Sequence, residues 1–529
     1  MPPVDRILVD MLSPRAPFSL YPATFFLYVG TVRSRYALFF YYVHCHPLMT
    51  HGSTNRRRTC IDILDDDSLL NIFYHCRPLL LLEGGDVDRI GLWDGRWEYD
   101  YWWYKLARVC RRWRRLIITS PSYLGISLVC RPGTPVADML AHSPPFPLII
   151  DHLYLHDNIS AEDEETTRLA LGHHDRVRRI CLQMDTLPLM RLLAAVDGAF
   201  PLLEYLYICP LTWPDTDLSL PSTLRAPHLR HLMLDGFAFP IGSSLPVGLV
   251  TLSLELNRSA NFSLNELLQQ LSLMPHLETF RLSFCPAHSN HDVERQLLQM
   301  PLSTHVTLPA LHWFGFEGVY MEAVLPRITM PLLKGTEIVS MMFSHSNLPS
   351  SILFTLQSMC ETENPRLSNV KVTFYDKHIV VTMCPRKRTD MPTLRVRVLC
   401  VYPTFALWSI VHVLSAIKAV LTEVESLTVE EKSSSRYAIS EFGLSIPNKL
   451  LWRELLEPFN KVQVLHVSGG DLIEALSGSL RPYNGKSAIE LLPMLRVLSC
   501  PKGSHIGKSC RSFITDRRRA GSPVTISHH

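Results

Sequence analysis

Residues Trp103–Leu128 read WYKLARVCRRWRRLIITSPSYLGISL, and the spacing of their apolar side chains decides how the first part of the chain folds. These side chains recur with the period of an amphipathic helix. They are Leu106, Val109, Cys110, Trp113, Leu116 and Ile117. Arginines occupy the other sides. The helix should end near Ser120-Pro121, because the residue before a proline is disfavoured in the α region.

A second, shorter amphipathic helix is predicted upstream at Leu64–Cys76, which reads LDDDSLLNIFYHC. Its aspartates at 65–67 can cap the first turn and place negative charge at the positive end of the helix dipole. Leu69, Ile72 and Phe73 then share one face. Between the two helices lies a glycine-containing insert at 77–102, whose tail WEYDYW is expected to extend the second helix.

Together these two stretches resemble an F-box. L-A-x-V-C-R-x-W-R-x-L followed by S-P-S-Y-L resembles its second half. Residues 64–73 resemble the opening L-P-x-E-L-L-x-x-I-F, with Asp65 in place of the proline and Ser68 in place of a leucine. The resemblance implies an F-box over residues 59–130 that binds a Skp-type adaptor and, through it, a cullin ubiquitin ligase. Docking of the helices in a groove of that adaptor would use as contacts Leu64, Leu69, Ile72, Phe73, Leu106, Val109, Cys110, Trp113 and Leu116.

A six-residue template, L-x-x-L-x-L, recurs after the F-box-like segment. It is found at 177–182, 203–208, 229–234, 249–254, 277–282 and 311–316, and again at 424–429, 462–467 and 495–500. The first five copies are separated by about 20 to 28 residues, the period of leucine-rich repeats. A hairpin is expected where Leu367-x-x-Val370-x-Val372 meets His378–Met383. Such units cannot bury their own apolar strand face, so neighbouring units must stack.

The predicted fold class is therefore α/β: a short helical F-box followed by an irregular leucine-rich-repeat-like solenoid with a curved sheet over residues 131–529. We expect a proline-rich linker at 131–147 and a first strand at 148–155. Helices are expected at 162–172, 187–196, 264–273, 407–422, 450–459 and 512–519. The layout of residues 60–529 resembles fungal F-box proteins with degenerate leucine-rich repeats. A general α/β domain of leucine-rich strands is the alternative.

Substrate-binding residues are predicted from the alternation of side chains along each strand. If the template leucines point to the core, the residues between them point to the exposed, concave face. Those of recognition type are Tyr205, Tyr207, His231, Met233, Arg281 and Trp313. The alternative is that they pack beneath covering loops, which leaves the segments at 287–292 and 344–351 as candidates for recognition.

Residues 1–58 differ from the rest of the chain. Two aromatic, apolar patches at 18–30 and 36–43 are separated by Arg33 and Arg35, and each is shorter than the roughly 20 residues that span a bilayer. We therefore predict an extension without regular structure, with a membrane anchor as the alternative. No membrane association and a cytoplasmic or nuclear location are expected.

Composition limits the function classes. Of 529 residues, 47% are apolar and 19% charged, which argues against a wholly disordered chain. A net charge of +3 argues against a nucleic-acid binder, although the arginine runs at 56–58 and 517–519 could be weak nuclear signals or solvated surface.

The 13 cysteines are scattered without a C-x-x-C pair, which favours a reducing compartment. His44-Cys45-His46 and His173-His174-Asp175 lack the partners of a metal site.

No enzyme activity and no cofactor are predicted. Residues 503–509, GSHIGKS, have three residues between the glycines where a phosphate-binding loop needs four, and no parallel strand is expected after them. The acidic run at 162–165 is interpreted as an exposed helix start. The sequence thus favours an adaptor for ubiquitin-dependent protein degradation. A stand-alone repeat scaffold is the first alternative, and a nucleotide-hydrolysing enzyme resting on residues 503–509 is the second.

Overall fold

A computed structural model of the chain describes part of its 529 residues. The described ranges are 25–32, 35–42, 64–76, 102–153, 159–212, 218–237, 247–256, 264–284, 305–317, 324, 327–333, 335–341, 367–375, 378–385, 394–399, 403–432, 449–469, 472, 476, 479–480, 490–501 and 510–528. Contacts divide the chain into two compact units. The first holds residues 1–83, 87–203 and 223–226, and the second holds 84–86, 204–222 and 227–529.

The amino-terminal extension contains a hairpin that the sequence analysis did not predict. Strands β1 (Phe25–Val32) and β2 (Arg35–Tyr42) pair antiparallel, with Phe25 opposite Tyr42 and Val32 opposite Arg35. Both strands are rich in aromatic and β-branched residues, which favour extended backbone. The apolar patches that are too short to span a bilayer are thus long enough for strands, and the prediction of an extension without regular structure is wrong for these residues.

Four helices open the rest of the first unit: α2 (Asp66–Cys76), α3 (Trp102–Ala107), α4 (Arg111–Thr119) and α5 (Pro121–Leu124). The long helix predicted from Trp103 is therefore two helices. The break lies at Cys110, whose backbone is extended with φ −156° and ψ 170° and whose Sγ accepts a hydrogen bond from the Trp113 amide at 3.5 Å. Cys110, which was expected in the apolar stripe of one long helix, is thus the N-cap of α4. The end predicted at Ser120-Pro121 is confirmed.

Three parallel strands complete the first unit: β3 (Leu128–Cys130), β4 (Leu148–His152) and β5 (Val177–Met184). Helices α6 (Val136–His142), α7 (Ala161–Leu171) and α8 (Thr186–Leu193) alternate with them. Helix α6 lies inside residues 131–147, which were predicted to be a linker. The Trp103 ring of α3 lies 6.0 Å from Phe146 ahead of β4, so helices and first strands share a core. The boundary predicted at residue 130 therefore does not separate the two units.

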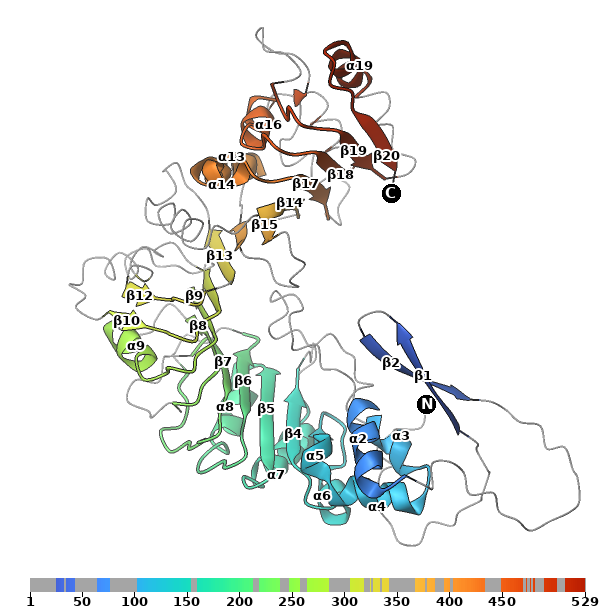
Figure 1. The fold of residues 1–529 in the computed structure, drawn as a ribbon. Helices are drawn as coiled ribbons and strands as arrows, with labels where there is room; N and C mark the ends of the chain where they lie inside the picture. Colours follow the sequence, from blue (N-terminus) through green and yellow to red (C-terminus); the bar gives the residue numbers. More distant parts are fainter. Residues whose placement is uncertain are drawn as a thin grey trace, which may run out of the picture. The chain divides into compact units, whose positions relative to one another are not determined.

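The second unit contains a mostly parallel sheet (Figure 1). Its strand order is β6 (Tyr205–Pro210), β7 (His231–Asp235), β8 (Thr251–Leu256), β9 (Thr279–Phe284), β11 (Trp313–Glu317), β13 (Gly335–Met341), β16 (Leu394–Leu399), β15 (His378–Pro385), β14 (Leu367–Phe374), β17 (Ser426–Glu431), β18 (Val464–Ser468), β19 (Val497–Cys500) and β20 (Thr525–His528). Only β15 runs against its neighbours. Short strands β10 (Val306–Thr307) and β12 (Ile328–Thr329) pair separately.

Every copy of the template forms a strand, and the hairpin of β14 and β15 is confirmed. Strands β16 and β20 were not predicted. The template residues define the leucine face of the sheet, which is in register from strand to strand and buried. Its central row is Leu206, Leu232, Leu252, Phe280 and Phe314. Mixed α/β architecture is therefore shown.

One backbone arrangement recurs where the chain enters successive strands. A single carbonyl oxygen accepts hydrogen bonds from two consecutive amides of the next strand, at 2.8–3.0 Å. The carbonyls belong to Glu204, Arg230, Val250 and Glu278, and their donors are residues 230–231, 250–251, 278–279 and 312–313. Glu425 and Gln463 repeat the arrangement at 2.8–3.3 Å ahead of β18 and β19. Identical local geometry in successive units is what stacked tandem repeats produce.

The described part of the second unit contains the helices α9 (Leu264–Leu271), α13 (Pro403–Ala416), α14 (Lys418–Leu421), α16 (Lys449–Leu456) and α19 (Arg511–Arg519). All of them lie where the apolar periodicity predicted helix, with shifted ends. The Trp452 ring of α16 packs 5.7 Å from Phe374 of β14. No helix among the described residues has the length and apolar character needed to cross a membrane.

Arg517 corrects the interpretation of a basic run at 517–519. Its side chain is fully buried, and its guanidinium donates to the carbonyls of Leu492 at 3.2 Å, Pro493 at 3.1 Å and Leu495 at 3.1 Å. Leu492 has φ 52°, so its carbonyl is turned out of regular structure just before β19. Arg517 therefore holds α19 to this turn, and it is unavailable as part of a nuclear signal.

Candidate functional site

The residues predicted to contact a Skp-type adaptor divide into core and surface. Leu69 and Phe73 are fully buried, and the Phe73 ring packs edge-on against Trp113 at 4.7 Å. Leu106 and Leu116 are also buried, whereas Leu64, Ile72 and Val109 are half-buried and Cys110 is exposed. The buried residues join α2, α3 and α4 to each other and are not presented to a partner. Their burial disagrees with the prediction that they make the contact directly.

An exposed aromatic pair lies on the surface of the same helices. Tyr74 of α2 is 38% exposed, Tyr123 of α5 is 50% exposed, and their rings lie 5.6 Å apart. Tyrosine is enriched at protein interfaces because it buries a large apolar area and retains a hydroxyl for hydrogen bonding. Sequence analysis placed Tyr123 in the S-P-S-Y-L motif but did not select it, because the buried stripe gave the stronger periodic signal.

The amino-terminal end of α2 is fixed by polar contacts. The Ser68 amide donates to the Asp65 carboxylate at 2.7 Å, and this bond holds the pKa of Asp65 below its usual value. Arg112 of α4 donates to Asp66 at 2.8 Å and to the carbonyl of Leu64 at 2.6 Å. The predicted cap at Asp65 is therefore present, and an arginine expected on a solvated face connects two helices.

The predicted substrate-binding residues lie on one face of the second unit's sheet, here called the polar face. It is defined by the side chains that alternate with the leucine face on β6–β11. Backbone pairing aligns two rows across the strands: Tyr205, His231, Thr251, Thr279 and Trp313, and Tyr207, Met233, Ser253, Arg281 and Gly315. The alternation was predicted correctly. However, Tyr205, Tyr207, Met233 and Trp313 are only 5–8% exposed.

These buried side chains contact one another. The Tyr205 hydroxyl donates to Met233 Sδ at 3.5 Å, and His231 Nδ1 lies 3.1 Å from Thr251 Oγ1. The Trp313 ring lies over Gly315, where an added Cβ would be 2.6 Å from Cη2 of the indole. Glycine at this position is therefore required for the ring to lie flat along the strand. Contacts with neighbouring strands therefore account for part of the burial of Tyr205, Met233 and Trp313, while His231 and Arg281 stay partly exposed.

A third row of the polar face, which the sequence analysis missed, carries carboxylates. Asp235, Glu255, Ser283 and Glu317 are aligned in register. Arg281 donates to Glu317 at 3.2 Å, and Ser283 donates to the same oxygen at 2.9 Å. The Tyr207 hydroxyl donates to Asp235 at 3.2 Å. The signal was available, because these residues have the same parity along their strands as the predicted polar-face residues and so share their face.

Burial alters the protonation of this row. Desolvation raises the pKa of Asp235, although hydrogen bonds from Cys209 and Tyr207 oppose the change. Desolvation raises the pKa of Glu255 to about 7, with further contributions from the neighbouring Asp235 and Glu317 carboxylates. The row can therefore change its charge near neutral pH. Among the described residues, no group of histidine, cysteine and acidic side chains is arranged to hold a metal ion.

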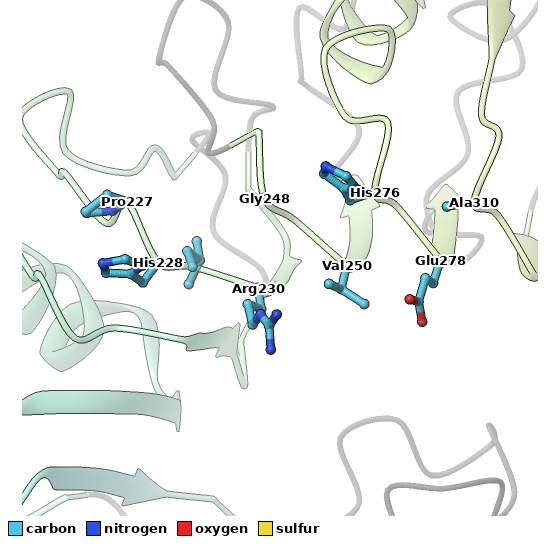
Figure 2. Close-up of a pocket in the computed structure, with 9 residues that line it drawn as sticks. Pro227, His228, Arg230, Gly248, Val250, His276, Glu278 and Ala310 are labelled. Atoms are coloured by element: carbon cyan, nitrogen blue, oxygen red, sulfur yellow. The ribbon is translucent and has the colours of Figure 1, made fainter. Parts of the chain in front are cut away.

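A groove of about 400 Å³ opens where the chain enters β7, β8, β9 and β11 (Figure 2). It is lined by Pro227, His228, Leu229, Arg230, Gly248, Val250, His276, Glu278 and Ala310. His228, Arg230, His276 and Glu278 are exposed. The tripeptide Pro-His-Leu occurs at both 227–229 and 275–277. The sequence analysis did not single out these repeated histidines.

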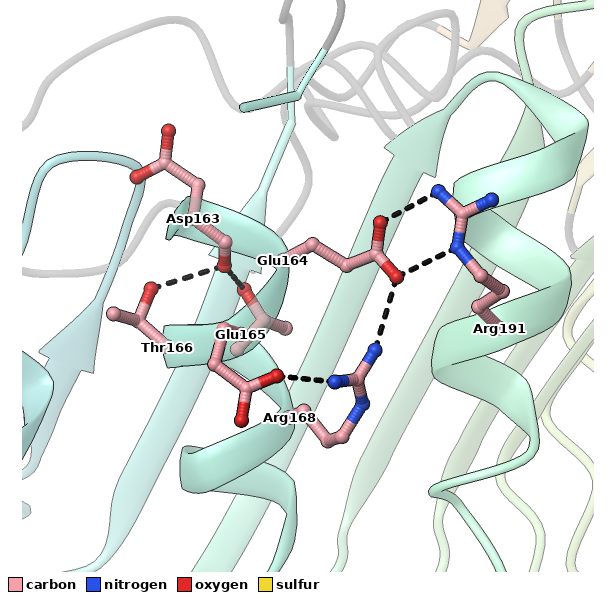
Figure 3. A network of polar contacts seen from close by, with 7 residues as sticks. Asp163, Glu164, Glu165, Thr166, Arg168 and Arg191 are labelled. Carbon is pink, nitrogen blue, oxygen red and sulfur yellow. Dashed lines mark hydrogen bonds and ion pairs between the residues drawn. The ribbon is translucent and has the colours of Figure 1, made fainter. Parts of the chain in front are cut away.

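A charge network in the first unit has a structural role (Figure 3). Glu164 of α7 accepts hydrogen bonds from Arg191 of α8 at 2.7 and 2.6 Å and from Arg168 at 3.0 Å. Glu165 pairs with Arg168 on the surface. The acidic run was predicted to be an exposed helix start. This is wrong for Glu164, which is 8% exposed and joins two helices.

Several predicted features lie outside the described residues. They are the segment at 44–46, the loops at 287–292 and 344–351, and the glycine-containing loop at 503–509. Strand β20 follows that loop and pairs parallel with β19, which corrects the expectation that no parallel strand follows. The His174 ring lies 4.6 Å from Phe200, so one histidine of the 173–175 group packs against an aromatic side chain.

Comparison with known proteins gave no matching family model and no match among curated proteins.

Proposed function

We propose that the chain is the substrate-recognition adaptor of an SCF-type ubiquitin ligase. Residues 59–130 would act as an F-box that binds the Skp-type subunit, and the repeat strands of the second unit would hold a protein substrate. The observation that carries the proposal is the group of short helices α2, α4 and α5, which pack around Phe73 and Trp113 and present the Tyr74–Tyr123 pair. The recurring strand geometry of the second unit supports the second half of the proposal.

Such an adaptor performs no chemistry of its own. It accelerates ubiquitin transfer by holding a substrate lysine near the ligase's charged partner enzyme, which is a proximity effect. The cytoplasm or nucleus would be the compartment. The described cysteines are free thiols, as a reducing compartment allows.

The proposal is tested by measuring binding of the full chain to a purified Skp-type subunit. Replacing the exposed pair, Tyr74→Ala with Tyr123→Ala, should weaken binding by about tenfold or more if the rings are interface anchors. Because both rings are substantially exposed, the fold should survive, and circular dichroism verifies this. Leu187→Ala in α8 is the matched control, since Leu187 is 71% exposed and lies outside these helices. Unchanged affinity in the folded double variant would contradict the proposed contact.

The alternative is a stand-alone repeat scaffold whose amino-terminal helices cap the sheet. The contact between Trp103 and Phe146 favours it, because it buries part of the helical group against the strand-bearing region. A scaffold would bind other proteins but would show no affinity for a Skp-type subunit. The same binding experiment with the natural chain therefore distinguishes the two functions.

A further inference from the structure

We propose that the groove at the start of β7, β8 and β9 binds a protein segment in the polyproline II conformation that carries an acidic and a basic side chain three residues apart. The groove is distinct from the polar face. Calling its ligand a substrate rests on the proposed function, whereas binding of the segment itself does not.

The charges of the groove are placed by the recurring backbone arrangement. Arg230, Val250 and Glu278 occupy equivalent positions, since each provides the carbonyl that accepts two amides of the next strand. Their side chains consequently leave the backbone in the same direction, as Figure 2 shows. The row presents a guanidinium, an isopropyl group and a carboxylate in that order. His228 lies near Arg230, whereas the His276 ring lies above Val250 in this view, away from the Glu278 carboxylate.

Strand spacing sets the length of the ligand. Neighbouring strands lie about 4.8 Å apart, so positions two strands apart are separated by about 10 Å. A segment in the polyproline II conformation advances about 3.1 Å per residue with three residues per turn, so side chains three residues apart lie on the same side of the segment and about 9 Å apart. A segment crossing the strands could place an acidic side chain at Arg230 and a basic one at Glu278. Its middle would contact Val250 and the edge of Leu229.

The charged groups of the groove are available to a ligand. Within the part of the chain that the structure describes, the side chains of Arg230, Glu278, His228 and His276 make no hydrogen bond or ion pair. Glu204 occupies the equivalent position before Arg230, but it has its own partner and does not line the groove. An exposed ion pair alone contributes little to affinity. Two pairs at fixed spacing over an apolar floor can contribute both affinity and selectivity.

Fluorescence anisotropy of the full chain with labelled eight-residue peptides tests the proposal. The probe has Asp and Lys three positions apart in an alanine and serine background, and a second peptide has them adjacent. We expect the spaced peptide to bind at least about tenfold more tightly, with an affinity that falls as salt is added. Arg230→Glu and Glu278→Arg should each weaken binding by a similar factor. The double variant should restore it, because the reversed charges accept the peptide in the opposite direction.

Arg496→Glu is the matched control, because Arg496 is an exposed arginine at the corresponding place before β19. It should bind the peptide like the natural chain. Equal affinity for the spaced and adjacent peptides would overturn the proposal, as would a double variant that remains as weak as the single ones. The peptide experiment does not measure binding to the Skp-type subunit. A negative result for the groove proposal can therefore be told apart from a negative result for the adaptor function.

Discussion

His152 is a buried histidine whose hydrogen bonds determine its protonation. The Thr167 hydroxyl donates to the carbonyl of Asp163 at 2.6 Å, so it accepts from His152 Nε2 at 2.8 Å. The proton of the neutral ring is therefore on Nε2. Nδ1 is buried, and no described residue is its hydrogen-bond partner. Protonating Nδ1 would leave a charged donor unsatisfied, and desolvation lowers the pKa of His152 to about 4.

Lowering the pH should therefore destabilise the first unit through His152. Between pH 6.5 and 4 the unfolded chain binds this proton and the folded chain does not, so stability falls as pH falls through that range. At about 1.4 kcal/mol per pKa unit, the full effect is about 3 kcal/mol. His152→Gln retains a donor toward Thr167 and does not titrate. Urea unfolding at several pH values should show a shallower acid loss in the variant; parallel curves would contradict the assignment.

Glu255 should have the opposite effect in the second unit. Its folded pKa of about 7 lies above the ordinary value of 4.5, so the folded state holds a proton that the unfolded chain releases. The contribution of this proton to the free energy of unfolding is fully present below pH 4.5. It is lost as the pH rises to 7, and its full size is about 3 kcal/mol. His152 acts in the reverse sense in the first unit, so each variant is compared with the natural chain at every pH and the difference isolates one group. Glu255→Gln should remove the alkaline loss, and an unchanged slope would show that Glu255 is ionised in the folded chain.

Individual residues were the hardest part to predict from sequence. Cys110 and Arg517 fit their expected patterns, an apolar stripe and a basic run, yet one is an exposed cap and the other a buried hydrogen-bond donor. Periodicity reports which side of an element faces the core. It does not report the carbonyls or amides that tertiary structure brings close to a polar side chain. Alternation could have placed the carboxylates of β7, β8 and β11 on the polar face, but it could not report their hydrogen bonds with Tyr207 and Arg281.

At the scale of elements, the bond between α7 and α8 provides a matched pair of variants. Glu164→Ala removes the acceptor of Arg191 and Arg168, and should lower the free energy of unfolding by about 1 to 2 kcal/mol. Glu165 pairs with the same Arg168 but is exposed, so Glu165→Ala should change it by less than about 0.5 kcal/mol. Chemical denaturation measures both. Equal losses of unfolding free energy in the two variants would show that the hydrogen bonds of Glu164 to Arg191 add no stability.

Most elements followed from the sequence because their apolar period is strong. The template found the strands β5 to β9, β11 and β17 to β19, and the helices between them lie within a few residues of the predicted ends. Strands β3 and β16 lack the template, and α6 lies among prolines that indicated a linker. The hairpin of β1 and β2 was missed because its patches were judged only against the length of a membrane span.

For the whole molecule, sequence and structure agree on the order of parts but not on their boundary. The helical group and the first strands belong to one unit, because Trp103 and Phe146 share its core. A sequence boundary drawn after the F-box-like motif could not include that contact, which joins residues 43 positions apart. The alternation of faces on β6–β11 was predicted correctly, whereas exposure was not. Exposure depends on tertiary neighbours such as Met233 at Tyr205, Asp235 at Tyr207 and Gly315 at Trp313.

The measurement that tests the central claim most directly is the binding of the natural full-length chain to a purified Skp-type subunit. Size-exclusion chromatography with mass determination should show a one-to-one complex, and titration should give a dissociation constant in the range of specific protein complexes, about micromolar or tighter. The Tyr74→Ala, Tyr123→Ala chain should elute apart from the subunit, while the Leu187→Ala chain should co-elute with it. A folded natural chain that elutes separately from the Skp-type subunit would contradict the adaptor function.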